Sequence, residues 1–390
     1  MNRRHITITD KSKCCGCGAC VQKCPQKAIS LSYDKEGFKY PVVNNNCIDC
    51  GLCINVCHLI TPKDLTHYSL EQTQCYGGFN KEDKVLNKSS SGGIFWPLVE
   101  YIISINGVVY GAELHDSFEV IHKRGETLSA CIPFMKSKYL QSDTLQTYNE
   151  VKKDLLSGNK VLYSGTPCQI AGLYAFLNKD YDNLYTCEVI CHGVPSRSAF
   201  DKWLIDLEKM HGSKAISMVW RDKIKGWEPN RITYNFSNGT SFTSTSQSNL
   251  FQRGFLDNLY LRPSCYHCKY AKLPRIADIS LADFWGYKGK LKEINHNKGL
   301  SIILLSSDKG VKLFNKIKDK LQYQKEDISY VMKCSRHVHI HPVTNVFRKM
   351  FFKTLSNHTF TYSATKYIYP NLLLRIYRKI IKSLENDSNR

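Results

Sequence analysis

Hydrophobic and polar residues alternate in short runs along the first sixty residues of the chain. Strand-like runs cover residues 6–8, 28–31 and 38–42, and each lies next to a loop that carries cysteines. The stretch that begins at Thr61 is polar and lacks periodicity, which is typical of a linker. We therefore expect a small first domain over residues 1–60, a linker over 61–74 and a second unit from residue 75.

The second unit repeats a strand–turn–helix pattern. A buried strand (160–163), a turn (164–168) and a helix (169–177) are followed by a strand (185–190), a turn (191–195) and a helix (196–210) capped by Ser196. This order implies a parallel βαβ unit, and 301–305 with the helical run 308–321 repeats it. Asn238-Gly239 between 231–236 and 241–246 predicts a hairpin. The pattern predicts an α/β (α+β) domain over residues 75–344.

The regular pattern is lost in the tail, residues 345–390. The tail carries nine Lys or Arg residues against two acids and ends in an amphipathic stretch, 372–384. We expect a surface helix that docks on its own domain, with peripheral contact to an anionic membrane or to a partner as the alternative. The run 369–384 is too short and too charged to span a bilayer.

Composition and charge narrow the class of protein. Hydrophobic residues make up 42% and charged residues 23% of the chain, as in a folded globular protein. The formal net charge of +20 would suit nucleic acid, but no helix-turn-helix or RNA-binding motif accompanies it, so we expect no nucleic-acid partner. Residues 1–10 contain no apolar signal segment, which predicts a cytoplasmic protein with reduced thiols.

Seventeen cysteines are unevenly spread, and nine of them fall between Cys14 and Cys57. The spacing C-x2-C-x2-C-x3-C-P is that of bacterial ferredoxins, in which the fourth cysteine ligates the other 4Fe-4S cluster. Zinc prefers two separated pairs and fits this spacing badly. Cys15 is surplus and is expected to be structural, and His58 stands where the repeat would have a proline. We therefore assign Cys14, Cys17, Cys20 and Cys57 to cluster 1, and Cys47, Cys50, Cys53 and Cys24 to cluster 2.

A third group of cysteines lies in the second unit. Cys168 and Cys191 follow consecutive parallel strands, whose carboxyl ends share one edge of the sheet, and Cys265 with Cys268 forms a CxxC pair. From spacing alone, a third iron–sulfur cluster, a zinc ion and unconnected thiols all remain open.

The Ser- and Gly-rich segment 88–93 precedes an apolar run, 94–105. Such a loop at a helix N-terminus attracts phosphate, because free amides and the helix dipole point at the anion. The same composition also serves as an ordinary helix cap.

Five motifs in order resemble the beta-subunit family of coenzyme F420-reducing hydrogenases and dehydrogenases. They are Ser89-Ser90-Ser91-Gly92-Gly93, the segment 136–142, Gly165-Thr166-Pro167-Cys168-Gln169 with 170–173, Cys191-His192-Gly193-Val194-Pro195-Ser196, and the stretch from Cys265 through Asp278 to Gly286. The resemblance covers about residues 75–340. It implies a flavoprotein domain with an iron–sulfur cluster beside FAD, and includes relatives associated with polysaccharide biosynthesis.

The resemblance also implies the residues of the site. FAD would lie along Ser90, Ser91, Gly92 and Gly93, with Lys138, Gln141 and Thr166 nearby. The third 4Fe-4S cluster would use Cys168, Cys191, Cys265 and Cys268. His192 is the one candidate for a catalytic proton donor.

The expected function is that of an oxidoreductase. Electrons from a protein or ferredoxin donor would pass through the ferredoxin clusters and the third cluster to FAD, and then to a small organic acceptor. The alternative is an electron-transfer subunit that relays electrons to a partner enzyme without a substrate of its own.

Overall fold

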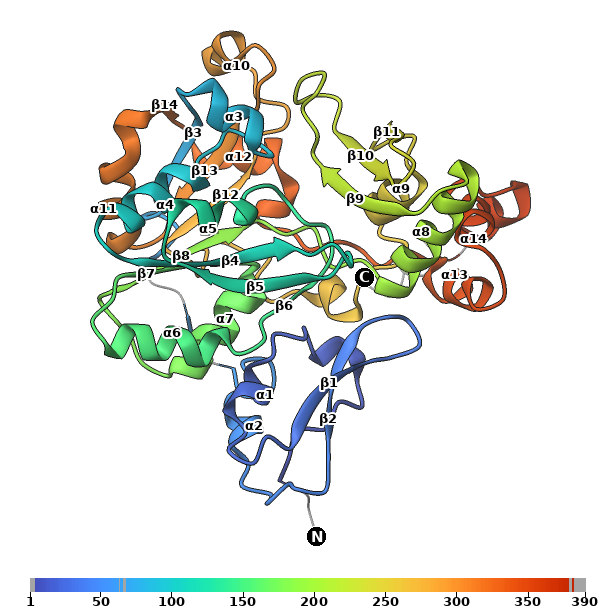
Figure 1. The fold of residues 1–390 in the computed structure, drawn as a ribbon, viewed down its shortest axis with the longest axis horizontal. Helices are drawn as coiled ribbons and strands as arrows, with labels where there is room; N and C mark the ends of the chain where they lie inside the picture. The colour runs from blue at the N-terminus through green and yellow to red at the C-terminus, as the bar shows by residue number, and fades with distance from the viewer. Residues whose placement is uncertain (1–3, 63, 66–67, 379–380, 382–390) are drawn as a thin grey trace.

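The computed structural model describes residues 4–62, 64–65, 68–378 and 381. The chain is built on a large mixed sheet that lies between two layers of helices. The N-terminal domain is docked beneath it (Figure 1). The predicted tail residues 379–380 and 382–390 lie outside the described part.

The N-terminal domain is a two-stranded sheet with short helices around cysteine loops. β1 pairs antiparallel with β2. Residues 6–8, predicted as strand-like, form no strand, because Ile6 is buried and its N–H donates to Cys53 Sγ at 3.2 Å. The elements are η1 (Lys11–Lys13), α1 (Ala19–Lys23), β1 (Ile29–Tyr33), β2 (Lys39–Val43) and α2 (Leu52–Asn55).

The described chain contains one nine-stranded sheet, in the order β14-β3-β13-β12-β8-β7-β4-β5-β6. β4, β7, β8 and β12 run parallel to one another at the centre of the sheet. Its strands are β3 (Gln74–Asn80), β4 (Val108–Leu114), β5 (Val120–Gly125), β6 (Ser142–Asp143), β7 (Val161–Gly165), β8 (Leu184–Val189), β12 (Ile279–Asp283), β13 (Ser301–Leu305) and β14 (Leu321–Lys325).

The predicted βαβ unit is present, since β7 and β8 pair in parallel on either side of α7. Thr166 and Gln169 form a capping box at the start of α7, with Pro167 at its first turn. The third strand–turn–helix segment differs: β13 runs antiparallel to both β12 and β3. A fully buried apolar strand has the same composition in either direction, so the sequence could not decide its orientation.

Helices cover the sheet on both faces. They are α3 (Asp83–Lys88), α4 (Phe95–Ser104), α5 (Leu128–Cys131), α6 (Thr147–Leu156), α7 (Pro167–Leu177), α10 (Lys290–Asn295), α11 (Asp308–Ile317) and α12 (Ile328–Cys334), with the short turns η2 (Ile132–Phe134), η4 (Lys318–Lys320) and η5 (Arg336–Val338).

A second, three-stranded sheet stands beside the large one (Figure 1). The predicted hairpin at Asn238-Gly239 joins β10 to β11, and β9 completes the order β11-β10-β9. Its elements are α8 (Arg197–His211), β9 (Ala215–Trp220), β10 (Arg231–Phe236), β11 (Ser241–Thr245), α9 (Leu250–Leu256) and η3 (Pro263–His267). Ser196 caps α8 as predicted, accepting from Ala199 N.

The tail contributes to the hydrophobic core around the three-stranded sheet. α13 (Arg348–Leu355) and α14 (Phe360–Ile368) pack on α8 and α9, and Phe347, Phe351 and Phe360 are fully buried there. Within the described residues, no helix is both long and apolar enough to cross a bilayer.

Candidate functional site

A cavity of about 950 Å³ opens at the carboxyl ends of β7 and β8, between the large sheet and the three-stranded one. Parallel α/β sheets bind their ligands at this edge. Its volume lies near the upper end of the range of about 300–1,000 Å³ common for cofactor pockets. Six of the seven residues expected beside a flavin line it: Ser90, Ser91, Gly93, Lys138, Gln141 and Thr166.

The seventh, Gly92, packs behind this lining. A Cβ at Gly92 would come 2.5 Å from Gly78 O and 2.9 Å from Ser301 N, and the Gly92 N–H donates to Ser301 Oγ at 2.9 Å. Gly92 therefore lets the Ser–Gly loop approach the backbones of β3 and β13, and its role is one of close packing.

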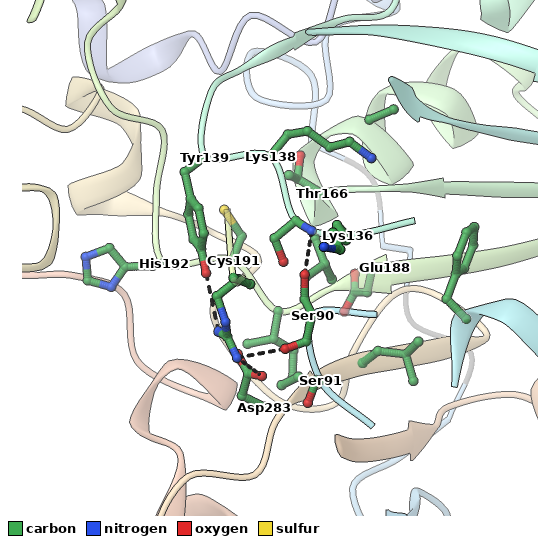
Figure 2. A pocket seen from close by; sticks show the side chains of 18 of the residues that line it. Ser90, Ser91, Lys136, Lys138, Tyr139, Thr166, Glu188, Cys191, His192 and Asp283 are labelled. Atoms are coloured by element: carbon green, nitrogen blue, oxygen red, sulfur yellow. Dashed lines mark hydrogen bonds and ion pairs between the residues drawn. The ribbon is translucent and has the colours of Figure 1, made fainter. Parts of the chain in front are cut away.

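The Ser–Gly loop is held by a buried arginine, and Figure 2 shows Ser90 and Ser91 of this loop close to Asp283, which pairs with that arginine. Arg221 makes two hydrogen bonds to the Asp283 carboxylate, at 2.6 and 2.7 Å, and donates to Ser90 O at 3.0 Å. Ser90 Oγ accepts from Ser137 N at 2.7 Å. These contacts tie two walls of the cavity together and leave the Ser90 hydroxyl proton available.

Two lysines of this region are turned toward the backbone. Lys138 Nζ donates to the carbonyl oxygens of Pro133 and Met135, at 2.7 and 2.6 Å, and Lys223 Nζ donates to Ser91 O at 2.6 Å. Burial lowers the pKa of both Lys138 and Lys223 to about 7. Lys138 lines the cavity as expected, but its ammonium is held by carbonyls of its own segment.

The structure brings the third group of cysteines together at the cavity wall. Cys168 opens α7, Cys191 follows β8, Cys265 lies in η3 and Cys268 ends it. Burial raises the pKa of Cys191, and the thiols of Cys265, Cys168 and Cys268 raise it further through their proximity. Cys168 and Cys191 line the cavity, and Val194 N donates to Cys265 Sγ at 3.3 Å. A set of four thiols with backbone N–H donors suits an iron–sulfur cluster or a tetrahedral metal.

The N-terminal cysteines fall into two groups with crossed membership. One small hollow is lined by Cys24, Cys47, Cys50 and Cys53. Burial raises the pKa of Cys20 well above its usual range, and the thiols of Cys14 and Cys57 add to this. Cys24 thus lies with the second group of cysteines and Cys57 lies near the first, as the ferredoxin spacing led us to expect.

Cys15, expected to be structural, lies between the two domains. Ligand atoms of Cys15, Cys17 and His58 lie within 4.8 Å of one another, and Cys15 Sγ is 3.6 Å from His58 Nε2. A hydrogen bond with Cys15 is the largest cause that raises the pKa of Cys168. Cys15 therefore connects a thiol of the ferredoxin domain, Cys17, with a thiol of the cavity wall.

Two further residues, Gln141 and Gly172, lie at this junction between the two domains. Gln141, expected beside a flavin, uses its side-chain amide to donate to Cys15 O at 2.8 Å and accepts from Arg262 Nη1 at 3.1 Å. Gly172 in α7 lies so close that a Cβ would come 3.0 Å from Cys17 Sγ. Sequence reasoning missed Arg262 and Gly172, and their only signal was their position beside the cysteine motifs.

His192 lines the cavity, but both of its ring nitrogens have protein partners. Nε2 donates to Phe255 O at 3.2 Å, and Nδ1 is 3.1 Å from His337 Nε2. Burial lowers the pKa of His192 to about 4, so the ring is neutral near pH 7. In Figure 2 the ring lies to one side of the cavity, and its partner His337 was not predicted.

Comparisons with known proteins match both parts of the chain. Residues 158–330 match the family model for the C terminus of the coenzyme F420 hydrogenase/dehydrogenase beta subunit, and residues 13–59 match that of the 4Fe-4S dicluster domain. An uncharacterised ferredoxin of Methanocaldococcus jannaschii is 34% identical over 50 residues, which span 13% of this chain and 65% of that ferredoxin.

A chain of the F420-reducing NiFe hydrogenase complex from Methanosarcina barkeri is 17% identical in sequence. The match covers 75% of this chain and 90% of that chain, with a TM-score of 0.46. By the two family matches, residues 13–59 are a 4Fe-4S dicluster domain, and residues 158–330 belong to the coenzyme F420 hydrogenase/dehydrogenase beta-subunit family.

Proposed function

We propose that this chain is an iron–sulfur flavoprotein oxidoreductase. Electrons from a protein or ferredoxin donor enter the two ferredoxin-type clusters, continue through a third cluster at Cys168, Cys191, Cys265 and Cys268, and reach FAD and a small organic acceptor in the cavity. Bound flavin would supply the conversion between one-electron and two-electron transfer. The resemblance implies polysaccharide biosynthesis as the setting.

One observation carries this proposal: thiols of the ferredoxin domain and of the cavity wall meet at a single point. Cys168 and Cys191 line the cavity, and Cys15 of the ferredoxin domain lies near enough to Cys168 to raise the pKa of its thiol. With the cysteines assigned to clusters as proposed, the order in space would be cluster 2, cluster 1, third cysteine group and cavity. This is the order that a chain of electron carriers requires.

The cavity offers groups that suit a dinucleotide. The Ser–Gly loop lies immediately before α4, whose amino end supplies free amides and the positive end of the helix dipole for a pyrophosphate. Ser90 and Lys136 line the cavity and add a hydroxyl and a cationic side chain, and Arg221, which is paired with Asp283, lines it too. Thr166 also lines the cavity, next to Cys168, where a reacting ring would be close to the thiols.

Anaerobic purification with quantification of iron, sulfide and flavin tests the proposal. We expect about twelve irons and one FAD per chain, from three 4Fe-4S clusters. Gly92→Asp should abolish flavin binding and retain the iron, because its Cβ has no room against Gly78 O. Gly239→Asp is the matched control, since nothing lies within 4 Å of that turn position. Full flavin content in the Gly92 variant would contradict the placement.

The second candidate is a relay subunit with no substrate of its own. It is favoured by the family description itself, which names a beta subunit. A preparation with about twelve irons but no flavin, able to pass electrons to a second protein, would support this function and refute the flavoprotein.

A further inference from the structure

Arg262 is a fully buried arginine that crosses the junction between the two domains. It directly precedes η3, which carries Cys265, and its side chain is 0% exposed. Nε donates to Cys14 O and Nη2 donates to Lys39 O, both at 2.8 Å. Nη2 also lies 3.6 Å from Cys14 Sγ, at hydrogen-bond distance for sulfur.

The guanidinium is held so that it cannot turn away. Its Cζ lies 4.4 Å from the centre of the Tyr40 ring, and Nη1 donates to Gln141 Oε1. Gly16 leaves the space that this position needs: its φ is +70°, and a Cβ there would come 3.0 Å from Arg262 Nη1. The arginine, the ring and the glycine form one packed unit beside Cys14.

The charge of Arg262 has no carboxylate partner among the described residues. Three other arginines with little solvent exposure each form an ion pair: Arg221 with Asp283, Arg275 with Glu188, and Arg348 with Glu36. All protein acceptors of Arg262 are neutral carbonyl or amide oxygens, apart from the sulfur of Cys14. A guanidinium does not lose its proton in a protein, and a buried charge requires compensation.

We propose that Arg262 is a positioning residue for electron transfer, a fixed positive charge that raises the reduction potential of the cluster bound by Cys14. A 4Fe-4S cluster with four thiolates is an anion, and reduction by one electron from a low-potential donor makes it more negative by one charge. A buried cation beside it stabilises the reduced state more than the oxidised state. The inference rests on the proposed assignment of Cys14 to cluster 1, and it does not depend on flavin.

The location of Arg262 determines the direction of electron flow that its charge favours. Arg262 lies on the side of cluster 1 that faces Cys265 and the cavity, whereas the hollow lined by Cys24, Cys47, Cys50 and Cys53 lies in the distal part of the ferredoxin domain. A higher potential at cluster 1 than at cluster 2 draws an electron toward the domain junction. Arg262 thereby favours electron flow from the distal cluster to the one beside the cavity.

The test is an anaerobic redox titration of the full-length protein, followed by electron paramagnetic resonance. Arg262→Gln removes the charge, Arg262→Lys retains it, and Arg348→Gln is the control, because this arginine also joins the ferredoxin domain but is neutralised by Glu36. We expect Arg262→Gln to lower the constant for one-electron reduction of one cluster by at least tenfold, about 59 mV for a one-electron couple. Arg262→Lys and Arg348→Gln should stay close to the wild-type potentials.

Iron content separates this effect from a merely structural one. A lowered potential in an iron-replete Arg262→Gln variant, with wild-type iron and potentials in Arg262→Lys, supports the proposal, whereas loss of iron in Arg262→Gln would overturn it, because the arginine would then hold the cluster in place. Unchanged potentials in an iron-replete Arg262→Gln variant, or loss of about four irons in both variants, would overturn it. Flavin is measured in the same samples. Its absence from every variant would count against the proposed function and leave the potentials interpretable.

Discussion

Gly172 gives a quantitative test of how closely the ferredoxin domain is seated. In Gly172→Ala the new Cβ would lie 2.9 Å from Tyr148 Oη and 3.0 Å from both Cβ and Sγ of Cys17. Favourable contacts need about 3.5–4.0 Å, so either α7 or the Cys17 loop must move by roughly 0.5–1 Å. Such overpacking costs about 1–3 kcal/mol. Alanine returns about 1 kcal/mol as a better helix former.

The net expectation is a loss of roughly 0–2 kcal/mol in the free energy of unfolding, from these two opposed effects. Thermal unfolding of anaerobic protein should show a fall of a few degrees in Tm. Gly172→Ala/Tyr148→Phe removes the hydroxyl contact and is compared with Tyr148→Phe alone, because both lack the hydrogen bond from Tyr148 Oη to Gln169 O. The difference between these two variants belongs to the contact with Cys17. Iron content should be unchanged, and rapid-mixing spectroscopy should show slower reduction of the flavin that the proposed function places in the cavity. A Tm at or above wild type with unchanged rates would refute the close approach.

Other perturbations test the sheet, the pH response and the third cysteine group. Glu188→Gln should lower the free energy of unfolding, measured with denaturant, by about 3–5 kcal/mol, because the carboxylate is 0% exposed and the charge of its buried arginine partner would be left unpaired. A loss no larger than that from breaking an exposed ion pair would contradict this. Burial lowers the pKa of His122 to about 4, so the unfolded chain binds a proton at a higher pH than the folded chain does. The free energy of unfolding should therefore fall as pH drops from 6.5 toward 4, by at most about 1.4 kcal/mol per pH unit. His122→Asn should flatten that slope. Replacing Cys168 and Cys265 together with serine should remove about four irons, and unchanged iron would exclude the third cluster.

Local patterns in the sequence predicted the segments whose structure is determined locally. The β7–α7–β8–α8 succession follows from apolar runs, a capping box and the Ser196 cap, and the β10–β11 hairpin follows from Asn238-Gly239. The antiparallel direction of β13 was not predictable, because a strand buried on both faces carries no signal of its orientation. The tail was also underestimated: α13 and α14 fill the hydrophobic core around the three-stranded sheet through contacts with helices far away in sequence.

The same distinction holds at the site. Cysteine spacing is a local pattern, so the cysteines that line the distal hollow could be predicted from the sequence. Gln141 shows what a local pattern leaves out: it lines the cavity as its motif led us to expect, and its amide also holds the backbone of Cys15. Arg262 and Gly172 have no recognisable role until the two domains are docked, since each acts on a residue more than a hundred positions away.

The docked domains lead to a last prediction, that the ferredoxin domain and the cavity domain stabilise each other. Gln22 Oε1 accepts from the buried Tyr148 N–H at 2.8 Å, Ser196 Oγ donates to Glu36 O, and the buried Arg262 donates to Cys14 O and Lys39 O of the first domain.

Deleting residues 1–60 would leave these groups exposed or unpaired, and each unsatisfied buried partner costs about 1–3 kcal/mol. We therefore expect the truncated chain to unfold at a lower temperature and to be cleaved faster by proteases. Arg348→Gln, which loosens one contact of the same interface, should give a smaller change in the same direction. If the truncated chain has the same unfolding temperature as residues 75–390 of the intact protein, the first domain is joined to the rest only by the linker. In that case neither Arg262 nor Gly172 could set the distance between the clusters.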